Sequence, residues 1–136
     1  MARKKRHALL NLILGLTVIG CLLAFIAHSK NWTRIEQGQL TVLSGIYHQK
    51  IPLDSIQDLR FVEKLPQMER QSGFSWKARE KGIFKDSITQ AKVYVFVDDL
   101  RQRKLRLTYA DSLTLYFNYA DSSATQGFYD QIRPKD

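Results

Sequence analysis

The stretch that decides the fold is "AKVYVFVDDLRQRKLRLTYADSLTLYFN" at residues 91–118. Three segments in it follow a side-chain period of two, which is typical of β-strands that have one covered face. We therefore predict strands at 91–97, 104–109 and 112–118, joined by two hairpins. The residues expected to face inward are Ala91, Val93, Val95 and Val97, then Leu105, Leu107 and Tyr109, and finally Leu113, Leu115 and Phe117.

Weaker alternation upstream predicts four more strands. Turn residues separate the first three of them at Gln37-Gly38 and Ser44-Gly45, where glycine permits tight backbone geometry. The domain is therefore expected to contain about seven antiparallel strands. The four earlier strands are expected at residues 32–36, 39–43, 46–53 and 56–62.

The apolar period changes after the last predicted strand. Asp121 or Ser122 can cap a helix near 122–132, with Pro134 just beyond its end. Its inward stripe is expected to be Ala124, Phe128 and Ile132. A helix that follows seven strands can plug the open end of a half-closed barrel.

The N-terminal region predicts a membrane anchor. Residues 3–6 read "RKKR", and the segment from Ala8 to Ala27 contains no charge. As a helix, that segment spans roughly 30 Å, the thickness of a bilayer's hydrocarbon core. We predict a basic tail at 1–7, a transmembrane helix at 8–27 and a folded domain at 28–136. Without the four tail cations, 17 Lys and Arg remain against 13 Asp and Glu, so the domain is only mildly basic.

The distribution of cations predicts the orientation of the anchor. Four cations precede the apolar segment, whereas only Lys30 and Arg34 follow it closely. By the positive-inside rule, the N-terminus stays in the cytoplasm and residues 28–136 lie outside it. Trp32 is expected at the membrane interface, where indole rings gather.

Two cleaved forms compete with the uncleaved anchor. Ala27-His28-Ser29 resembles a signal-peptide cleavage site, and "VIGC" (Val18 to Cys21) resembles a lipobox that would lead to lipidation of Cys21. The apolar length favours the uncleaved anchor. Gly20 and Ala24 form a small-residue pair that would permit two such helices to pack together.

The segment "RQSGFSWKAREKGIF" (70–84) lacks apolar periodicity and is expected to be a long loop within residues 63–84 that joins the fourth and fifth strands. Gly73 and Gly82 would supply backbone freedom. Phe74, Trp76 and Phe84 would cover the barrel rim. Arg70 would hold the loop by bonding carbonyls or a carboxylate such as Glu69 or Asp86.

Two basic stretches are candidate contact surfaces for anionic headgroups or polymer. One lies in the predicted loop and the other in "LRQRKLRL" (100–107), where Asp98 and Asp99 can balance the charge. Ordinary loop packing and a solvated hairpin tip are the favoured explanations of the same residues. The candidate contact residues are Arg70, Trp76, Lys77, Arg79, Lys81, Arg101, Arg103 and Lys104.

Three motifs give the domain a family resemblance. They are "LSGIYHQKIPLDSI" (43–56), "RQSGFSWKAREKGIF" (70–84) and "YFNYAD" (116–121). In this order they resemble bacterial pleckstrin-homology-like (PH-like) domains that follow a membrane helix, over residues 33–132. The resemblance implies an open barrel with a capping helix in the bacterial cytoplasmic membrane, and no catalytic residues. The first turn, "EQGQ" (36–39), lacks the cations of phosphoinositide-binding relatives.

The sequence carries no recognisable catalytic or metal motif. Cys21 is the sole cysteine, so an intrachain disulfide and a paired-cysteine zinc site are excluded. We expect no enzyme activity, no cofactor, no metal and no nucleic-acid partner. The expected function is that of a membrane-anchored interaction module that binds a protein partner. The alternative is binding of anionic lipid or envelope polymer through the basic loops.

Overall fold

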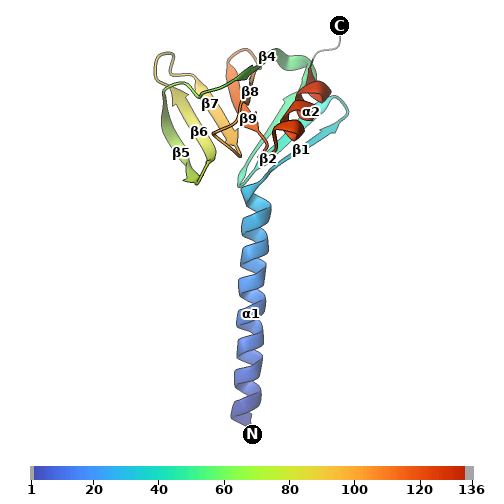
Figure 1. Ribbon diagram of the computed structural model, residues 1–136, viewed down its shortest axis with the longest axis vertical. Helices are drawn as coiled ribbons and strands as arrows, with labels where there is room; N and C mark the ends of the chain where they lie inside the picture. Colours follow the sequence, from blue (N-terminus) through green and yellow to red (C-terminus); the bar gives the residue numbers. More distant parts are fainter. Residues whose placement is uncertain (1, 134–136) are drawn as a thin grey trace.

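The computed structural model describes residues 2–133, and it describes the side chains there except at 2, 27–29, 74 and 76. Helix α1 (Ala2–Ser29) projects from one end of a β-domain and contacts none of it along most of its length (Figure 1). Its stretch Arg3–Ile26 is long and apolar enough to cross a membrane: an 18-residue window within it has a mean hydropathy of 2.6 and is wholly unburied. The predicted apolar N-terminal helix is therefore present.

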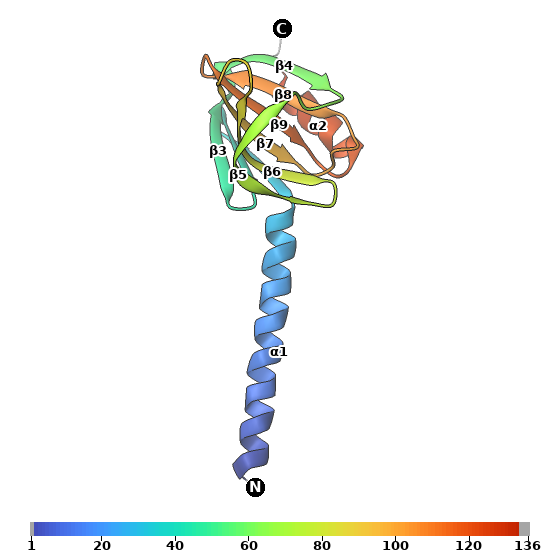
Figure 2. The same cartoon turned by 90° about the vertical axis from the view of Figure 1, so that its left-hand side faces the viewer.

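The β-domain contains two sheets. An antiparallel three-stranded sheet has the order β1-β2-β3, and a short 3₁₀ turn (Leu53–Ser55) leads from it into a six-stranded sheet of order β4-β8-β9-β7-β6-β5. The two sheets and α2 (Ser122–Ile132) enclose the core (Figure 2). The strands are β1 (Asn31–Glu36), β2 (Gln39–Ser44), β3 (Tyr47–Pro52), β4 (Ile56–Val62), β5 (Met68–Trp76), β6 (Arg79–Asp86), β7 (Lys92–Val97), β8 (Lys104–Tyr109) and β9 (Leu113–Asn118).

The predicted fold class is confirmed: a mainly β, PH-like barrel follows an apolar helix and ends in a capping helix. Asp121 caps α2, since its carboxylate accepts a bond from the Ser123 amide at 2.9 Å. Phe128 and Ile132 are buried as predicted, but Ala124 is exposed and Thr125 is buried instead. The hydroxyl of Thr125 accepts a bond from the Tyr119 amide at 3.0 Å, which explains a polar residue in this position.

The predicted long loop within residues 63–84 is wrong. Most of it is a hairpin of β5 and β6, closed by a turn in which Lys77 has a φ of 54°. Strand β5 lies at an edge of its sheet. Its described side chains from Glu69 onward are exposed on both faces, so they show no apolar alternation.

The predicted hairpin between 91–97 and 104–109 is also wrong. Strand β7 pairs in parallel with β9, and β8 lies on the other side of β9; the β8–β9 hairpin is confirmed. Both faces of β7 are buried, with Tyr94 and Phe96 in the main core and Val93, Val95 and Val97 in a second cluster. Because β7 is central, it requires two strand neighbours, β6 and β9.

Gly73 and Gly82 face one another across the β5–β6 hairpin at very close approach. A Cβ at Gly82 would clash with the carbonyl oxygen of Ser72, which is backbone and cannot swing aside. We expect Gly82→Ala to lower the free energy of unfolding by about 1–3 kcal/mol. Urea titration of the full-length protein in detergent would measure this.

The matched control for this substitution is Gly127→Ala on α2, where a new Cβ would meet no atom outside the helix within 4 Å. Alanine has a higher helix propensity than glycine, so the free energy of unfolding of this variant should rise by about 0.5–1 kcal/mol. Equal effects of the two substitutions would contradict the close approach of β5 and β6.

Candidate functional site

The end of the barrel from which α1 leaves, here called the anchor-side end, brings together five parts of the chain (Figures 1 and 2). Strand β1 begins there at Asn31, which lies opposite Ser44 at the end of β2. The β5–β6 turn, the end of β7 and the end of β9 lie beside it, because Glu80 is in register with Val97 and Val97 with Asn118. Segments far apart in the sequence thus converge on the end of α1.

A buried polar cluster occupies the interior of this end, and Asn31 is its centre. The side-chain amide of Asn31 donates to the carbonyls of Phe96 and Asn118, each at 2.7 Å. Its Oδ1 accepts bonds from the Ser44 hydroxyl and the Lys81 ammonium. The Asn31 amide also donates to Asp98 Oδ2 at 3.1 Å. The first residue of β1 is therefore bonded to four other strands or their ends.

Lys81 and Asp98 form a buried ion pair within the cluster. The Nζ–Oδ1 distance is 2.5 Å, and the two side chains are 0% and 4% exposed. Burial lowers the pKa of Lys81, and the Asp98 carboxylate opposes that shift. The prediction that Lys81 is a surface contact cation is therefore wrong, because its ammonium points into the barrel.

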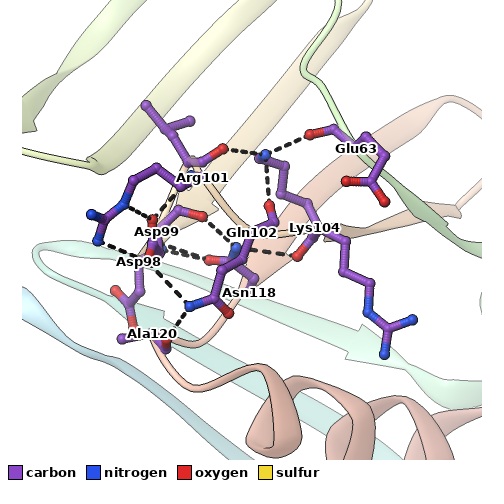
Figure 3. Close-up of polar contacts among 10 residues, drawn as sticks. Glu63, Asp98, Asp99, Arg101, Gln102, Lys104, Asn118 and Ala120 are labelled. Carbon is purple, nitrogen blue, oxygen red and sulfur yellow. Dashed lines mark hydrogen bonds and ion pairs between the residues drawn. The ribbon is translucent and has the colours of Figure 1, made fainter.

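The β7–β8 loop is fastened by two side chains that fill its interior (Figure 3). Asn118 Oδ1 accepts bonds from the amides of Asp98 and Asp99, while its Nδ2 donates to the Asp99 carbonyl at 2.7 Å. Lys104 Nζ donates to three carbonyls, those of Glu63, Leu100 and Gln102, at 2.6–2.8 Å. Lys104 is buried, and this desolvation lowers its pKa. Its predicted role as a surface cation is therefore also wrong.

Lys77 and Arg101 come from the two predicted basic stretches, and the fold brings them together. They line a shallow hollow of about 480 Å³ with Ala78 and Leu100. The Leu100 amide donates to the Ala78 carbonyl at 2.8 Å, which joins the β5–β6 turn to the β7–β8 loop. Arg101 bonds Asp99 through Nε at 3.0 Å, and this hydrogen bond lowers the pKa of Asp99.

Two further candidate contact residues, Arg70 and Arg103, make contacts outside the lining of this hollow. Arg70 pairs with Glu80 and lies 5.6 Å from the Phe84 ring, so it does hold its segment, although through a carboxylate other than the two predicted. Arg103 stacks 4.0 Å from the Phe61 ring and donates to Gln126 of α2. Arg79 is half-buried at the start of β6, and the Trp76 side chain lies outside the described residues.

The sequence did not identify the three residues that organise this end, which are Asn31, Asp98 and Asn118. Asn31 and Asp98 look like ordinary polar residues at strand ends, and nothing local shows that they meet across 67 positions of chain. Asn118 alone carried a signal, because it stands in the "YFNYAD" motif, where a strand ends in a buried amide. An amide can satisfy several loop backbone groups at once, which explains asparagine at this position.

Comparison with known proteins gives one family. A search of curated proteins and a search of solved structures yield no match. The family model described as "Bacterial PH domain" matches residues 33–115, more than half of the chain. The match begins in β1 and ends in β9, so it includes the β2–β3 turn, the β5–β6 turn and the β7–β8 loop. With this match and the barrel that α2 caps, the chain belongs to the bacterial PH domain family.

Proposed function

We propose that this protein is a membrane-anchored, non-enzymatic interaction module whose barrel binds a protein partner. A bacterial PH domain joined to an apolar helix supports a membrane-associated interaction module. The observation that supports binding of a protein partner is the edge of the six-stranded sheet at β5.

Among the described residues, 2–133, strand β5 pairs with β6 on one side and with no strand on the other. Its residues from Glu69 to Gly73 are exposed, and Gln71 forms a bulge between the pairs that Arg70 and Ser72 make with β6. Near the middle of this edge, the Ser72 hydroxyl is hydrogen-bonded to the Tyr47 hydroxyl at 2.6 Å. An extended peptide can add to such an edge through main-chain hydrogen bonds.

The proposed setting is the bacterial cytoplasmic membrane, crossed once by α1. The tail "RKKR" at residues 3–6 would remain in the cytoplasm, because cationic flanks resist translocation. The barrel, which begins after α1, would then lie on the extracytoplasmic side and meet partners there.

The alternative function is binding of anionic lipid or envelope polymer through the basic loops. Of the eight candidate residues, Lys81 and Lys104 are buried, while Arg70 and Arg101 are paired with carboxylates. Each exposed cation near an anionic surface contributes about 1 kcal/mol, so this loss weakens the case for charge-driven binding. The protein partner is therefore the favoured function.

One labelling experiment tests both the orientation and the partner. In a Cys21→Ala background, Gln71→Cys places the sole thiol on the β5 edge, and a membrane-impermeant maleimide–benzophenone reagent is added to spheroplasts. We expect Cys-directed labelling and, after irradiation, a discrete cross-linked product of higher mass. Gln71 suits this substitution because the bulge leaves it outside the β5–β6 register.

The matched control is Thr89→Cys, an exposed position in the β6–β7 turn at the other end of the barrel. It should be labelled equally but give no discrete product. If neither position is labelled until the membrane is permeabilised, the proposed orientation is wrong. If both are labelled and neither gives a product, the β5 edge does not bind a protein partner.

A further inference from the structure

We propose that the anchor-side end of the barrel rests in the lipid headgroup layer of the bilayer that α1 spans. This inference rests on the proposed membrane anchoring and adds a contact surface to it. The occupant of the surface is the headgroup layer itself, and the contact is imposed by the short connection between the anchor and the barrel.

The length of that connection limits how far the barrel can stand from the membrane. The uncharged segment ends at Ala27, α1 ends at Ser29 and β1 begins at Asn31. Three residues between the segment and β1 cover about 5 Å as helix. The headgroup layer on each side of a bilayer is about 5–7 Å thick. The start of β1 therefore lies within that layer.

Movement of α1 along its axis cannot take the barrel away from the membrane surface. Outward movement would draw the cationic residues 3–6 toward the hydrocarbon core, where each such charge costs about 2.5–3.5 kcal/mol at the centre. Inward movement would bring the barrel still closer to the lipid. The hydrogen bonds that join Asn31 to the barrel also prevent β1 from peeling away to lengthen the connection.

The surface at this end has the composition of a membrane-interface contact. Ile46 is 80% exposed in the β2–β3 turn, next to the Ser44–Tyr47 pair that faces the start of β1. Trp32 and Leu43 are neighbours in register on β1 and β2, and they are 52% and 42% exposed. Exposed apolar side chains beside a membrane anchor bury themselves at the boundary between headgroups and acyl chains.

Cations accompany these apolar residues. Lys30 is exposed directly after α1, and Lys77 is exposed at the hollow between the β5–β6 turn and the β7–β8 loop. Arg101 is exposed at the same hollow while it is paired with Asp99. Long basic side chains keep their charge at the level of lipid phosphates while their stems cover apolar surface. An indole, aliphatic side chains and cations thus surround the point where α1 enters the barrel.

The opposite end of the barrel supplies an internal comparison. Ile88 is 92% exposed in the turn between β6 and β7, so it matches Ile46 in residue type and exposure. Strand β6 runs from the anchor-side end to this turn, which places Ile88 away from α1 (Figure 1). A label at Ile88 reports on the same barrel without membrane contact.

The test measures water exposure at these two positions in the full-length protein. In the Cys21→Ala background, Ile46→Cys and Ile88→Cys are each labelled with NBD and placed in nanodiscs of phosphatidylcholine alone or with phosphatidylglycerol. We expect blue-shifted emission at position 46 and an iodide quenching constant about threefold lower than at position 88, in both lipid compositions. Neither substitution removes a buried side chain, so both variants should fold.

Equal quenching at the two positions in nanodiscs would overturn the proposal. Protection at position 46 only with phosphatidylglycerol would also overturn it, because recognition of charge would then replace the constraint of the short connection. Alkaline carbonate treatment of vesicles tests membrane anchoring separately from the headgroup contact. If the protein is extracted, anchoring itself is wrong; if it stays and position 46 is exposed, only the headgroup contact is wrong.

Discussion

Replacing Asp98 with alanine should lower the free energy of unfolding by about 3–5 kcal/mol, because the substitution leaves a buried ammonium without its counter-charge. The Lys81 side chain is fully buried, and Asp98 is the carboxylate within ion-pair distance of it. The same substitution removes the acceptor for the Asn31 amide. Urea titration of the full-length protein in detergent, followed by tryptophan fluorescence, would measure the loss.

The control for this prediction is Asp58→Ala on β4. Asp58 pairs with Arg60 and Arg106 at 3.4 Å, but its side chain is 47% exposed. Exposed pairs contribute about 0–1 kcal/mol, so this variant should be nearly as stable as the parent. Replacing both partners of the buried pair, as in Lys81→Met with Asp98→Leu, should recover part of the stability. If Asp98→Ala and Asp58→Ala lowered the free energy of unfolding by similar amounts, the buried ion pair would not be the cause of the loss of stability.

Replacing Phe128 with alanine should cost about 3–5 kcal/mol, the range found when a buried aromatic side chain leaves a cavity. Phe128 is 4% exposed, and its ring centroid lies 4.8 Å from that of Phe117 and 6.0 Å from that of Tyr119. These contacts join α2 to the strand end that carries Asn118. The same urea titration would report the effect, and loss of helical signal at lower urea than loss of strand signal would show that α2 detaches first.

Asp130→Ala on the exposed face of the same helix is the matched control. Asp130 is exposed and accepts a long hydrogen bond from Gln126 at 3.3 Å. Its replacement should change stability by less than about 0.5 kcal/mol. A parent-like Phe128→Ala protein would refute the role of α2 as the plug of the barrel.

The sequence predicted the strands whose side chains follow a period of two. Leu105, Leu107 and Phe117 alternate with polar residues, and all three are buried as expected. The β5–β6 hairpin was not predicted, because an edge strand that water reaches on both faces shows no alternation. The parallel pairing of β7 and β9 was not predicted either, because the order of strands in a sheet depends on packing between distant segments rather than on local pattern.

The candidate site was predicted less well than the fold, for a similar reason. A lysine is normally a surface residue, and a pattern of cations predicts an exposed basic surface. Lys81 departs from this rule because Asp98 and Asn31, 17 and 50 positions away, surround its ammonium. Lys104 departs from it because three loop carbonyls meet at one point. Neither arrangement has a signal in the residues that flank the lysine.

The fastening of Asn31 also has a mechanical consequence. Lys30 alone separates the end of α1 from Asn31, which is hydrogen-bonded to four other strands or their ends. The junction therefore lacks a flexible linker about which α1 could rotate freely. Rotation of α1 about its long axis is therefore transmitted as torque to the whole β-domain. Were two copies to pack through Gly20 and Ala24, the helix face chosen for that contact would determine which sides of the two barrels face each other. A change of pairing within the bilayer would thus turn the β5 edges toward or away from one another.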